Sequence, residues 1–318
     1  MKVKQILVTG GAGFIGSHVT KLLCDYGYTV TVVDDLRFGY KEFIDKRANF
    51  LRISLEDSKA IEEVLEDVDI VIHLAASSII SFSHTQPLEY FENNLINGVK
   101  LLEAMRKKGV KKIIYSSTSS VYGVQKKTPI KENAPTNPLS VYAASKLAFE
   151  HALISYYHSF DIESVSLRYY NVYGPRDEQK PRTRAVPMWI EAILENKPIP
   201  WFWQGRQIRD YIYVEDVAQS HLDVLNLKGI YCFNIGSGHG VYMRDVLKTL
   251  EKIVGKKLVT HDIGERKGDP MKSFSDISNI KKTVGWKPRV SLEEGLKKTL
   301  EYYKSQRLEK HGKIINTL

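Results

Sequence analysis

The chain has 318 residues, 43% of them hydrophobic and 26% charged, and its formal net charge at pH 7 is +9. This composition and length are those of a globular protein that forms one large domain or two lobes sharing a core. No apolar run is long enough to span a membrane, and the first residues lack the apolar segment and the cleavage site of a signal peptide. The sequence therefore predicts neither a membrane span nor a signal peptide.

The cysteines and the basic charge narrow the class further. Cys24 and Cys232 are far apart and neither belongs to a CxxC motif, which favours reduced thiols and a cytoplasmic location. Many lysines form scattered pairs at predicted helix ends and turns, without a stripe of interleaved aromatic residues. A solvated basic surface is therefore favoured over a nucleic-acid interface, although a positive field would help to attract a phosphorylated substrate. We expect no nucleic-acid partner, no membrane partner and no metal site.

The first half of the chain alternates short β-rich runs with longer stretches of helical periodicity. Runs such as ILV, VTVV and IVIHLAA are continuously apolar, which is typical of strands buried on both faces. The predicted strands cover residues 4–10, 28–36, 69–76, 110–117 and 163–172, and the predicted helices cover residues 14–27, 58–67, 87–109 and 140–160. Strands that alternate with crossover helices predict an α/β fold with a Rossmann-like doubly wound parallel sheet.

The alternation breaks near Asn171. A charged, turn-rich segment follows it, then a helical stretch at residues 186–198, and then shorter strand-like pieces and helices. We therefore predict a first domain at residues 1–170 and a smaller α/β lobe mainly at residues 171–318. Segments near residues 211–240 are expected to return to the first domain.

Three glycines, Gly10, Gly13 and Gly16, lie between the first predicted strand and the first predicted helix. In this context glycine permits a tight turn and lets backbone N–H groups approach a pyrophosphate at the positive end of the helix. Asp34 ends the second predicted strand about 20 residues downstream, where an acid can accept hydrogen bonds from the adenosine ribose. A carboxylate there would repel a 2′-phosphate, so NAD is favoured over NADP, while the nearby Arg37 leaves NADP open.

Tyr142 and Lys146, in VYAASK, are four residues apart on a predicted helix, so both side chains share one face. A free phenol has a pKa of about 10 and is a weak base at neutral pH. A nearby ammonium group and a positive nicotinamide ring would favour the phenolate. YxxxK alone is most often an exposed pair on a helix, but after a dinucleotide fingerprint and the hydroxyl-rich strand end YSSTSSVYG it indicates a catalytic pair.

With these residues identified, the sequence resembles the extended short-chain dehydrogenases/reductases, and within them the NAD-dependent nucleotide-sugar epimerases and dehydratases. The resemblance runs from Lys4 to about Thr299 and includes TGGAGFIGSH, VDDL, HLAA, LLEA, SSTSSVYG, YAASK, LRYYNVYGPR, GRQIRDYIYVEDVA, FNIGSG, ERKGDP and VGWKP. It implies NAD in the N-terminal domain and a nucleoside diphosphate sugar, with a UDP-sugar favoured, in the C-terminal lobe.

The resemblance also implies roles for the hydroxyl run and for the Tyr-Lys pair. Thr118 occupies the family's catalytic Ser/Thr position and would hydrogen-bond the sugar 4-hydroxyl alongside Tyr142. Lys146 would bind the nicotinamide ribose and lower the pKa of Tyr142, which takes the 4-OH proton while C4 gives hydride to NAD. Ser116 and Ser117 would lie beside the nicotinamide. The full implied cofactor set is Gly10, Gly13, Phe14, Ile15, Gly16, Asp34, Asp35, Leu36, Ser54, Leu55, Leu74, Ala75, Ala76, Asn94, Ser116, Ser117, Tyr142, Lys146 and Tyr169.

The two residues after Thr118 separate the branches of this family. The dehydratases that the chain resembles carry an Asp-Glu pair there, which removes water across C5 and C6, and the decarboxylases carry a glutamate at the second position. Here both residues are hydroxyls, Ser119 and Ser120, which cannot supply that step and which could equally serve to hydrogen-bond a turn. We therefore favour a 4-epimerase, in which the 4-keto sugar turns over and recovers hydride on its other face.

The alternatives are a dehydratase, a reductase or a UDP-glucuronate epimerase of the same family. A catalytically silent NAD-binding sensor or scaffold is a further alternative. The intact Thr118, Tyr142 and Lys146 argue against it, because a pure binder needs no such trio.

Several polar residues of the later chain match family positions that bind the nucleoside diphosphate. The planar fork of arginine suits phosphate oxygens, whereas Asp269 would take the ribose. Surface salt bridges explain many arginines, but they explain a set of motif-matched sites less well. The predicted substrate-binding residues are Ser78, Thr118, Asn171, Arg209, Arg266, Asp269 and Ser273.

The sugar pocket and the charged loop give two further expectations. Ser273 falls where some epimerases carry a tyrosine that narrows the pocket, so its small side chain predicts tolerance of UDP-N-acetylglucosamine as well as UDP-glucose. The loop arginines Arg176, Arg182 and Arg184 are expected to be solvated, with a role at a substrate carboxylate left open.

Two positions depart from the family pattern. Ser54 stands where many relatives have an aspartate that contacts adenine, so the adenine contacts are expected to be weaker or to move to Leu55 and its neighbours. Asn97 replaces a glycine, and the sequence offers no functional account of that change.

Assembly is predicted from two long helices that begin near Pro87 and Pro138. Relatives pair these helices in a homodimer, and here they carry extra aromatic residues, namely Tyr90, Phe91, Tyr156 and Tyr157. Packing of these aromatics within the monomer is the alternative.

Overall fold

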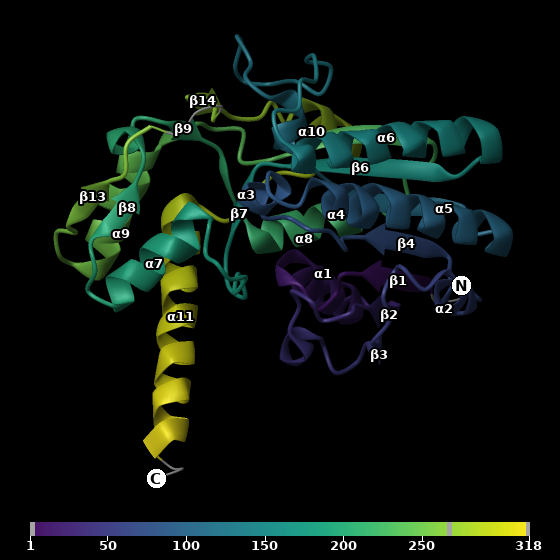
Figure 1. Cartoon of the computed structure of the whole chain (residues 1–318), viewed down its shortest axis with the longest axis horizontal. Helices are drawn as coiled ribbons and strands as arrows, with labels where there is room; N and C mark the ends of the chain where they lie inside the picture. Colours follow the sequence, from purple (N-terminus) through teal and green to yellow (C-terminus); the bar gives the residue numbers. More distant parts are fainter. Residues whose placement is uncertain (1–3, 266–268, 316–318) are drawn as a thin grey trace.

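The computed structural model describes residues 4–265 and 269–315, with side chains described to residue 308. Its larger body is a seven-stranded parallel sheet with the strand order β11-β6-β5-β4-β1-β2-β3 (Figure 1). The strands are β1 (Gln5–Thr9), β2 (Thr29–Val33), β3 (Asn49–Leu51), β4 (Ile70–His73), β5 (Lys112–Thr118), β6 (Glu163–Tyr169) and β11 (Ile230–Ile235). This order, with helices in the crossovers, confirms the predicted Rossmann-like doubly wound fold.

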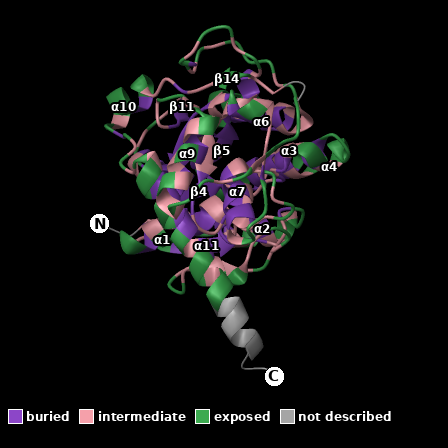
Figure 2. Ribbon diagram, turned by 90° about the vertical axis from the view of Figure 1, so that its left-hand side faces the viewer, coloured by how far each residue is buried: buried purple, intermediate pink, exposed green. Residues whose placement is uncertain are grey.

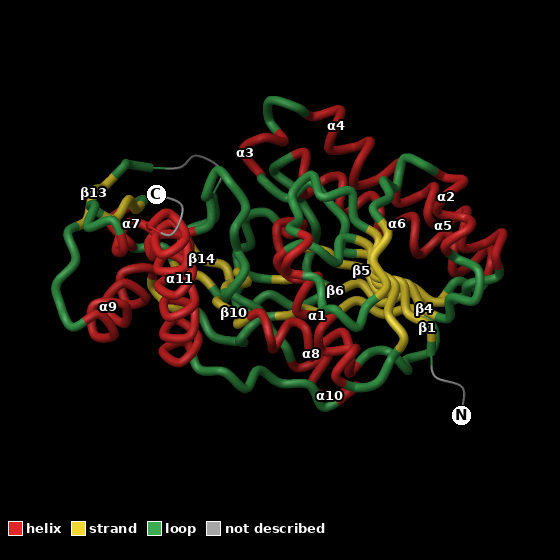
Figure 3. Tube along the Cα trace, turned by 90° about the horizontal axis from the view of Figure 1, so that it is seen from below, coloured by secondary structure: helices red, strands yellow, loops and turns green. Residues whose placement is uncertain are grey.

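Helices cover both faces of the sheet (Figure 3). One face carries α1 (Phe14–Asp25), α8 (Val214–Asp223) and α10 (Ser278–Val284), and the other carries α2 (Ser58–Val64), α5 (Asn97–Lys108) and α6 (Val141–Phe160). Side chains alternate along each strand, so Ile6 and Val8 of β1 pack under the first set of helices and Leu7 under the second. Because both faces are covered, β1 and β4 are largely apolar, as the sequence indicated, whereas β5 and β6 also bury polar side chains such as Ser117 and Arg168.

The long helix predicted at residues 87–109 is continuous but not uniform. It begins as α4 (Pro87–Phe91), passes through a π-helical segment, η2 (Glu92–Ile96), and continues as α5. Gly109 ends it in the left-handed conformation, directly after Lys107 and Lys108, an arrangement typical of helix C-termini. The π segment turns Asn94 inward, and π segments inside α-helices are frequently found at functional sites.

The second lobe has its own core, on the left of Figure 1 and Figure 3. Helices α7 (Ala185–Leu194), α9 (Met243–Val254) and α11 (Leu292–Ile315) surround a cluster of buried side chains that includes Trp189 and Leu250. The strands of this lobe form three small sheets, which pair β7 (Asn171–Tyr173) with β10 (Tyr211–Tyr213), β8 (Ile199–Trp201) with β13 (Thr260–Asp262), and β9 (Ile208–Arg209) with both β12 (Val241–Tyr242) and β14 (Lys272–Ser273).

Short helical turns occupy the remaining connections, and the burial pattern follows the layers. The turns are η1 (Lys41–Phe43), α3 (Ile80–Ser83), η3 (Ser119–Tyr122) and η4 (Trp203–Gly205). Buried residues concentrate on the strands and on the inner helix faces, while exposed residues mark the outer helix faces and the loops (Figure 2). Within residues 4–265 and 269–315, no helix is both long and apolar enough to cross a membrane.

The parallel strands all end at the same edge of the sheet, where ligand sites of such folds form. The chain returns to this sheet after residue 171, because β11 pairs with β6. The loops that carry the glycine turn, the hydroxyl run and the start of the second lobe therefore meet along one edge.

Candidate active site

The glycine turn closes tightly between β1 and α1. Gly10 has a φ of 73°, and its N–H donates to the Val33 carbonyl at 2.8 Å. A Cβ atom on Gly16 would run into the Gly10 carbonyl oxygen, so only glycine fits there. Among the described residues no side chain caps α1 at Gly13, so the first N–H groups of this helix face the strand ends, where an anion can bind.

Asp34 lies directly after β2 and closes the same turn. Its carboxylate accepts hydrogen bonds from the backbone N–H of Ala12 at 3.0 Å and from that of Leu36 at 2.8 Å. Burial raises the pKa of Asp34, and the two backbone hydrogen bonds oppose that rise. Leu36 itself has a φ of 63°, a strained value for a leucine, which turns the chain back toward the carboxylate.

A cavity runs from the glycine turn past Asp34 along the strand ends. Most of the residues predicted to hold the adenosine half of a dinucleotide line it, namely Gly10, Gly13, Asp34, Asp35, Ser54, Leu55, Leu74, Ala75 and Ala76. Phe14, Ile15 and Gly16 form the first turn of α1 beside it. The lining also contains Val33, Arg37, Phe38, Gly39, Ile53 and Asn93, of which the sequence motifs pointed only to Arg37. The lining of this cavity fits the adenosine half of a dinucleotide, because it combines an acid that can accept from ribose hydroxyls with a glycine-lined helix end that can bind phosphate.

Asn94 was predicted to contact the cofactor, but the structure commits its side chain elsewhere. The amide oxygen accepts the Ser77 N–H at 2.8 Å, and the amide nitrogen donates to the Ser77 carbonyl at 3.0 Å and to Ser145 Oγ at 3.1 Å. Asn94 therefore ties the π segment to α6 and to the loop after β4. Its neighbour Asn93 is the residue that reaches the cavity.

Tyr142 and Lys146 share one face of α6, as their spacing predicted. Ser140 fixes the start of this helix, because its hydroxyl accepts the Ala143 N–H at 3.1 Å. Lys146 is only 2% exposed, and its Nζ atom lies 4.5 Å from the ring centroid of Tyr115 on β5. The helix thus delivers a phenol and an amine to the ends of the central strands.

The protonation of this pair is set mainly by burial. Burial raises the pKa of Tyr142, while hydrogen bonding from Thr118 and the charge of Arg184 lower it. Burial lowers the pKa of Lys146 to about 7, while the charge of Glu150 raises it. In the ligand-free protein Tyr142 is therefore a neutral phenol at pH 7, and a base there requires positive charge to be brought to the site.

The side chains of the hydroxyl run from Ser116 to Ser120 point in three directions. Thr118 Oγ1 accepts the Ser120 N–H at 3.1 Å and donates to Ser120 Oγ at 3.2 Å. Ser117 points away from the strand ends, and its hydroxyl donates to Glu150 on α6. Ser116 lies on the opposite face of the strand, where it hydrogen-bonds Tyr169, whose hydroxyl also pairs with His221 Nε2 at 2.7 Å.

The structure brings most of the predicted substrate residues together in the second lobe. Arg209 Nη2 pairs with Asp269 at 2.8 Å, and Ser273 lies opposite Arg209 in the β9–β14 pairing. Asn171 Nδ2 donates to the carbonyl of Asp210, the next residue after Arg209, at 2.9 Å. Arg266 lies outside the described residues.

Asp210 organises this region, and the sequence motifs did not identify it as important. It is fully buried, and its carboxylate accepts hydrogen bonds from the backbone N–H and hydroxyl groups of Ser237 and Ser275 and from the Gly238 N–H. These residues follow β11 and β14. One carboxylate therefore joins the edge of the large sheet to the second lobe.

The expectation that the loop arginines are solvated is wrong for Arg182, whereas the side chain of Arg184 is 37% exposed. The Arg182 side chain is 8% exposed, pairs with Glu178 at 2.9 Å and lies over the Tyr303 ring. Arg184 forms a two-pronged pair with Asp177, with contacts of 2.7 and 2.9 Å, and also donates to Gln179 at 3.0 Å. The polar partners Asp177, Glu178 and Gln179 lie within the same loop, whereas the Tyr303 ring comes from α11. The charge pattern alone did not reveal these contacts.

The same loop connects to a further predicted residue and to the cofactor side. Gln179 accepts a hydrogen bond from the Ser78 hydroxyl at 3.2 Å. Arg176 is partly buried and donates to the carbonyl oxygens of Ser17 and Phe43. The loop that begins the second lobe therefore lies against the glycine-turn helix.

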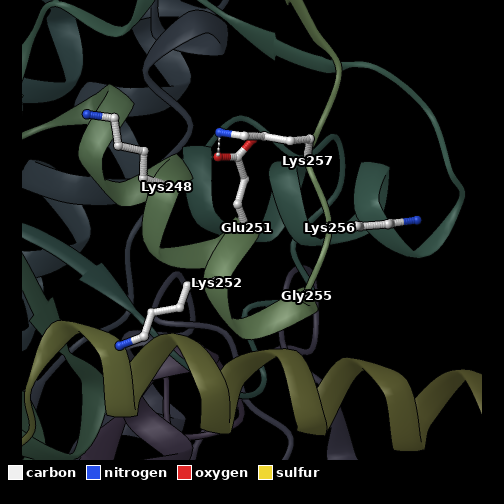
Figure 4. A pocket seen from close by; sticks show the side chains of 6 residues that line it. All are labelled: Lys248, Glu251, Lys252, Gly255, Lys256 and Lys257. Atoms are coloured by element: carbon white, nitrogen blue, oxygen red, sulfur yellow. Dashed lines mark hydrogen bonds and ion pairs between the residues drawn. The ribbon is translucent and has the colours of Figure 1, made fainter.

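A second hollow lies on the outer side of the second lobe, away from these residues. It is lined by α9 and the turn after it, with Lys248, Glu251, Lys252, Gly255, Lys256 and Lys257 (Figure 4). The lysines point in different directions, and most are paired: Lys252 with Glu293, Lys257 with Glu251, and Lys256 with Asn196. This arrangement is that of a paired basic surface, with no group of donors converging on one point.

The fold and the strand-end residues define an α/β protein of the dinucleotide-binding type, with a Tyr-Lys pair at the strand ends and a second, smaller lobe. The sequence model of the "NAD dependent epimerase/dehydratase family" matches residues 6–236. The chain belongs to this family, which confirms the resemblance seen in its motifs.

Three solved structures of sugar-nucleotide epimerases are similar to this chain over nearly its whole length. The UDP-glucose 4-epimerase of Thermotoga maritima, solved with UDP-glucose, is 38% identical with a TM-score of 0.92, covering 95% of this chain and 99% of that one. The UDP-N-acetylglucosamine 4-epimerase of Methanobrevibacter ruminantium, in complex with UDP-N-acetylmuramic acid, is 34% identical with a TM-score of 0.90, covering 96% and 100%. The UDP-glucose 4-epimerase of Thermus thermophilus, in complex with NAD, is 36% identical with a TM-score of 0.88, covering 94% and 99%.

Proposed function

We propose that this protein catalyses the NAD-dependent inversion of C4 in a UDP-sugar. The observation that carries the proposal is the grouping of Thr118, Tyr142 and Lys146 at the strand ends, with no acid in the two positions after Thr118. The similarity to UDP-glucose 4-epimerases over nearly the whole chain supports it.

The chain's own residues account for binding and for proton movement. Tyr142 and Thr118 hold the sugar 4-hydroxyl, and Tyr142 takes its proton as C4 is oxidised to a ketone. Lys146, which points along the same helix face, holds the nicotinamide ribose and favours the phenolate form of Tyr142. When bound by the glycine turn and Asp34, NAD would supply the reversible hydride acceptor for C4. Tyr142 then gives the proton back to the 4-oxygen of the inverted sugar.

The surroundings of Thr118 support epimerisation over water loss. Elimination across C5 and C6 needs an acid and a base beside the sugar. Ser119 and Ser120 lie in a short 3-10 turn, and Ser120 is held by Thr118 through two hydrogen bonds. The carboxylate nearest to this run, Glu150, is paired behind the strand with Arg168 at 2.6 Å. A dehydratase would leave a deoxy methyl product, which this arrangement has no group to form.

The test of this function is incubation with a panel of UDP- and GDP-sugars followed by NMR of the anomeric protons. Inversion at C4 without net formation of NADH is the expected result for UDP-glucose and UDP-galactose. A deoxy methyl signal, or consumption of NADH without inversion, would replace the epimerase with one of the alternatives.

The nucleotide and sugar ends of the substrate are assigned to the second lobe. Arg209 and Asp269, already paired with each other, would bind the diphosphate and the ribose, together with Asn171 and Arg266. Ser273 lies opposite Arg209 in the pairing of β9 with β14, so its small side chain is placed beside a predicted phosphate-binding arginine. A small residue there leaves room for a 2-acetamido group.

This pocket assignment predicts a selective effect of Ser273→Tyr. Turnover of UDP-N-acetylglucosamine should fall at least about 10-fold, because one ring in a pocket excludes the acetamido group. Turnover of UDP-glucose should stay within about threefold of the parent value. Ser273→Ala is the matched control and should keep both activities. Equal losses with both sugars, or rejection of the acetamido sugar by the parent protein, would rule out the assignment.

The role of Asp34 in NAD binding can be tested by comparing substitutions at Asp34 and at its neighbour Asp35. Asp34→Asn should weaken NAD binding about 10- to 100-fold, because a charged acceptor for the ribose hydroxyls is lost. Asp35→Asn is the matched control, since Asp35 lies at the same cavity but its side chain is 39% exposed and pairs loosely with Arg37. Titration calorimetry of the NAD-free protein gives both affinities. Equal losses in the two variants would show that Asp34 does not hold the ribose.

We further propose that the protein is a homodimer located in the cytoplasm. Helices α4 and α6 lie against each other and, with the π segment, carry the exposed side chains of Leu88, Ile96 and Ile154. Tyr90 does not contribute to that face, because it is buried and donates to the Ile79 carbonyl. The unpaired thiols of Cys24 and Cys232 support a reducing compartment.

A further inference from the structure

A buried ion pair lies one helical turn beyond the Tyr-Lys pair. Tyr142, Lys146 and Glu150 follow one another at intervals of four residues, so all three line the same face of α6. Glu150 receives Arg168 in a two-pronged pair, with Nη2 at 2.6 Å and Nε at 3.0 Å from its oxygens. Both side chains are less than 10% exposed. The pair therefore lies inside the protein, directly behind Lys146.

Strand register explains why the pair forms at this point. Ser117 of β5 lies opposite Arg168 of β6, so their side chains stand next to each other on one face of the sheet. Glu150 reaches down from α6 onto both of them, accepting from Ser117 Oγ and from the guanidinium. Thr118 is the next residue along β5. One carboxylate thus holds helix α6 on the two strands whose ends carry the proposed catalytic hydroxyls.

Arg168 is in turn held by neutral groups on its far side. Its Nη1 donates to the Tyr122 hydroxyl at 2.9 Å and to the Glu132 carbonyl at 3.1 Å, and its guanidinium lies over the Tyr122 ring. The Tyr122 hydroxyl donates to Asn234 on β11 at 2.7 Å. A network of this kind, with its polar groups satisfied, fixes a single arrangement of the strands and the helix.

We propose that Glu150 and Arg168 are positioning residues of the active site, which together fix α6 on β5 and β6 and keep the net charge behind Lys146 at zero. The proposal rests on the proposed roles of Tyr142 and Lys146. Neither Glu150 nor Arg168 reaches the strand-end cavity, so they act through the residues that do.

The charge balance has a direct consequence for pH dependence. Lys146 faces Tyr142 and Glu150 on its own helix, Tyr115 on β5 and His73 on β4, and Glu150 is the negative charge among them. Its charge raises the pKa of Lys146, which burial holds at about 7. Removing it leaves the permanent charge of Arg168 unbalanced, since a guanidinium does not deprotonate in proteins. The pKa values of Lys146 and of Tyr142 should then both fall.

The expected result is a displaced pH profile, and three variants test it. The active form carries ionised Tyr142 and protonated Lys146, so these two ionisations set the two limits of the pH profile. In Glu150→Gln both limits should move down by about one pH unit, the size expected for one unit charge nearby in a protein interior. In Arg168→Met both limits should move up, because the negative charge of Glu150 is then unbalanced. In the double variant Glu150→Gln/Arg168→Met the limits should return to the parent values.

Tyr122→Phe is the matched control for purely structural effects. It removes hydrogen bonds to Arg168 and Asn234 but no charge, so kcat and thermal stability can fall while both pH limits stay in place. The readout is kcat as a function of pH for conversion of UDP-galactose, with circular dichroism to establish folding. If Glu150→Gln does not fold, Arg168→Met provides the test by itself.

Different results would overturn the positioning role of Glu150 and Arg168 and the proposed epimerase function. Limits that stay unmoved in a folded, active single variant, or that fail to return in the double variant, overturn the charge role of the pair. An active Tyr142→Phe variant would instead overturn the catalytic assignment on which it rests.

Discussion

Tyr142→Phe is expected to lower kcat for UDP-galactose conversion by about 10²- to 10⁴-fold, the usual contribution of one positioned acid–base group. The substitution removes a single hydroxyl and keeps the ring, which packs edge-to-face against Tyr90 at a centroid distance of 6.5 Å. Substrate binding should therefore change little, and the loss should appear in kcat with KM nearly constant. A coupled assay that oxidises the UDP-glucose product measures both constants.

Tyr90→Phe is the matched control for this experiment. The Tyr90 ring forms the other half of this edge-to-face contact with Tyr142. Its hydroxyl, however, donates to the Ile79 carbonyl inside the protein at 2.5 Å. Losing that bond should cost about 1 kcal/mol of stability and leave kcat within about threefold of the parent value. If Tyr142→Phe retained full epimerase activity, or if both variants lost activity equally, the phenol would not be the base.

The sequence predicted the fold and the Tyr-Lys pair because both depend on local periodicity. Continuous apolar runs separated by helical stretches determine a parallel sheet, and a spacing of four residues places two side chains on one helix face. The glycine turn was equally predictable, because a Cβ at Gly16 has no space and a pyrophosphate site needs an open helix end. These features follow from residues that are close in the chain.

The features that the sequence did not predict depend on partners far apart in the chain. Arg168 and Glu150 are separated by 18 residues, and the carboxylate of Asp210 reaches Ser275 across 65 residues. Asn94 matched a cofactor position, but the π segment turns its amide toward Ser77. A motif identifies a residue type at a position, whereas the direction of its side chain depends on how the helix and the neighbouring loop pack.

Burial of charge was the least predictable property. Arg182 stands in a charged, turn-rich loop that is typical of solvated surface, yet its partners are Glu178 and the ring of Tyr303. The Tyr303 ring comes from α11, more than 100 residues later in the chain, and no local pattern connects the two. In the same way, the pairing of Lys252 on α9 with Glu293 on α11 follows only from the folded structure.

Asp210→Ala is expected to produce the largest loss of stability among the substitutions at the edge of the candidate site. The carboxylate is fully buried and accepts five hydrogen bonds, from the backbone N–H groups and hydroxyls of Ser237 and Ser275 and from the Gly238 N–H. Alanine would leave buried donors without an acceptor, at a cost of about 3 to 5 kcal/mol. For a chain of this size the corresponding fall in Tm is on the order of 10 °C.

Asp210→Asn separates loss of the acceptor from loss of volume. The amide keeps the shape of the side chain but turns a donor toward N–H and hydroxyl donors, so its stability should also fall, by less than that of the alanine variant. Asp276→Ala is the matched control, since the Asp276 carboxylate is partly exposed and accepts local hydrogen bonds, from the N–H at 2.8 Å and the side chain of Ser278, and their loss should cost about 1 kcal/mol or less. Differential scanning calorimetry gives all three values. A Tm for Asp210→Ala within 2 °C of the parent value, a margin set by roughly 1 kcal/mol, would show that the lobes are joined by other contacts. Because Asp210 adjoins Arg209, the same variant should raise KM for the UDP-sugar more than it lowers kcat, which links the stability of this joint to substrate binding.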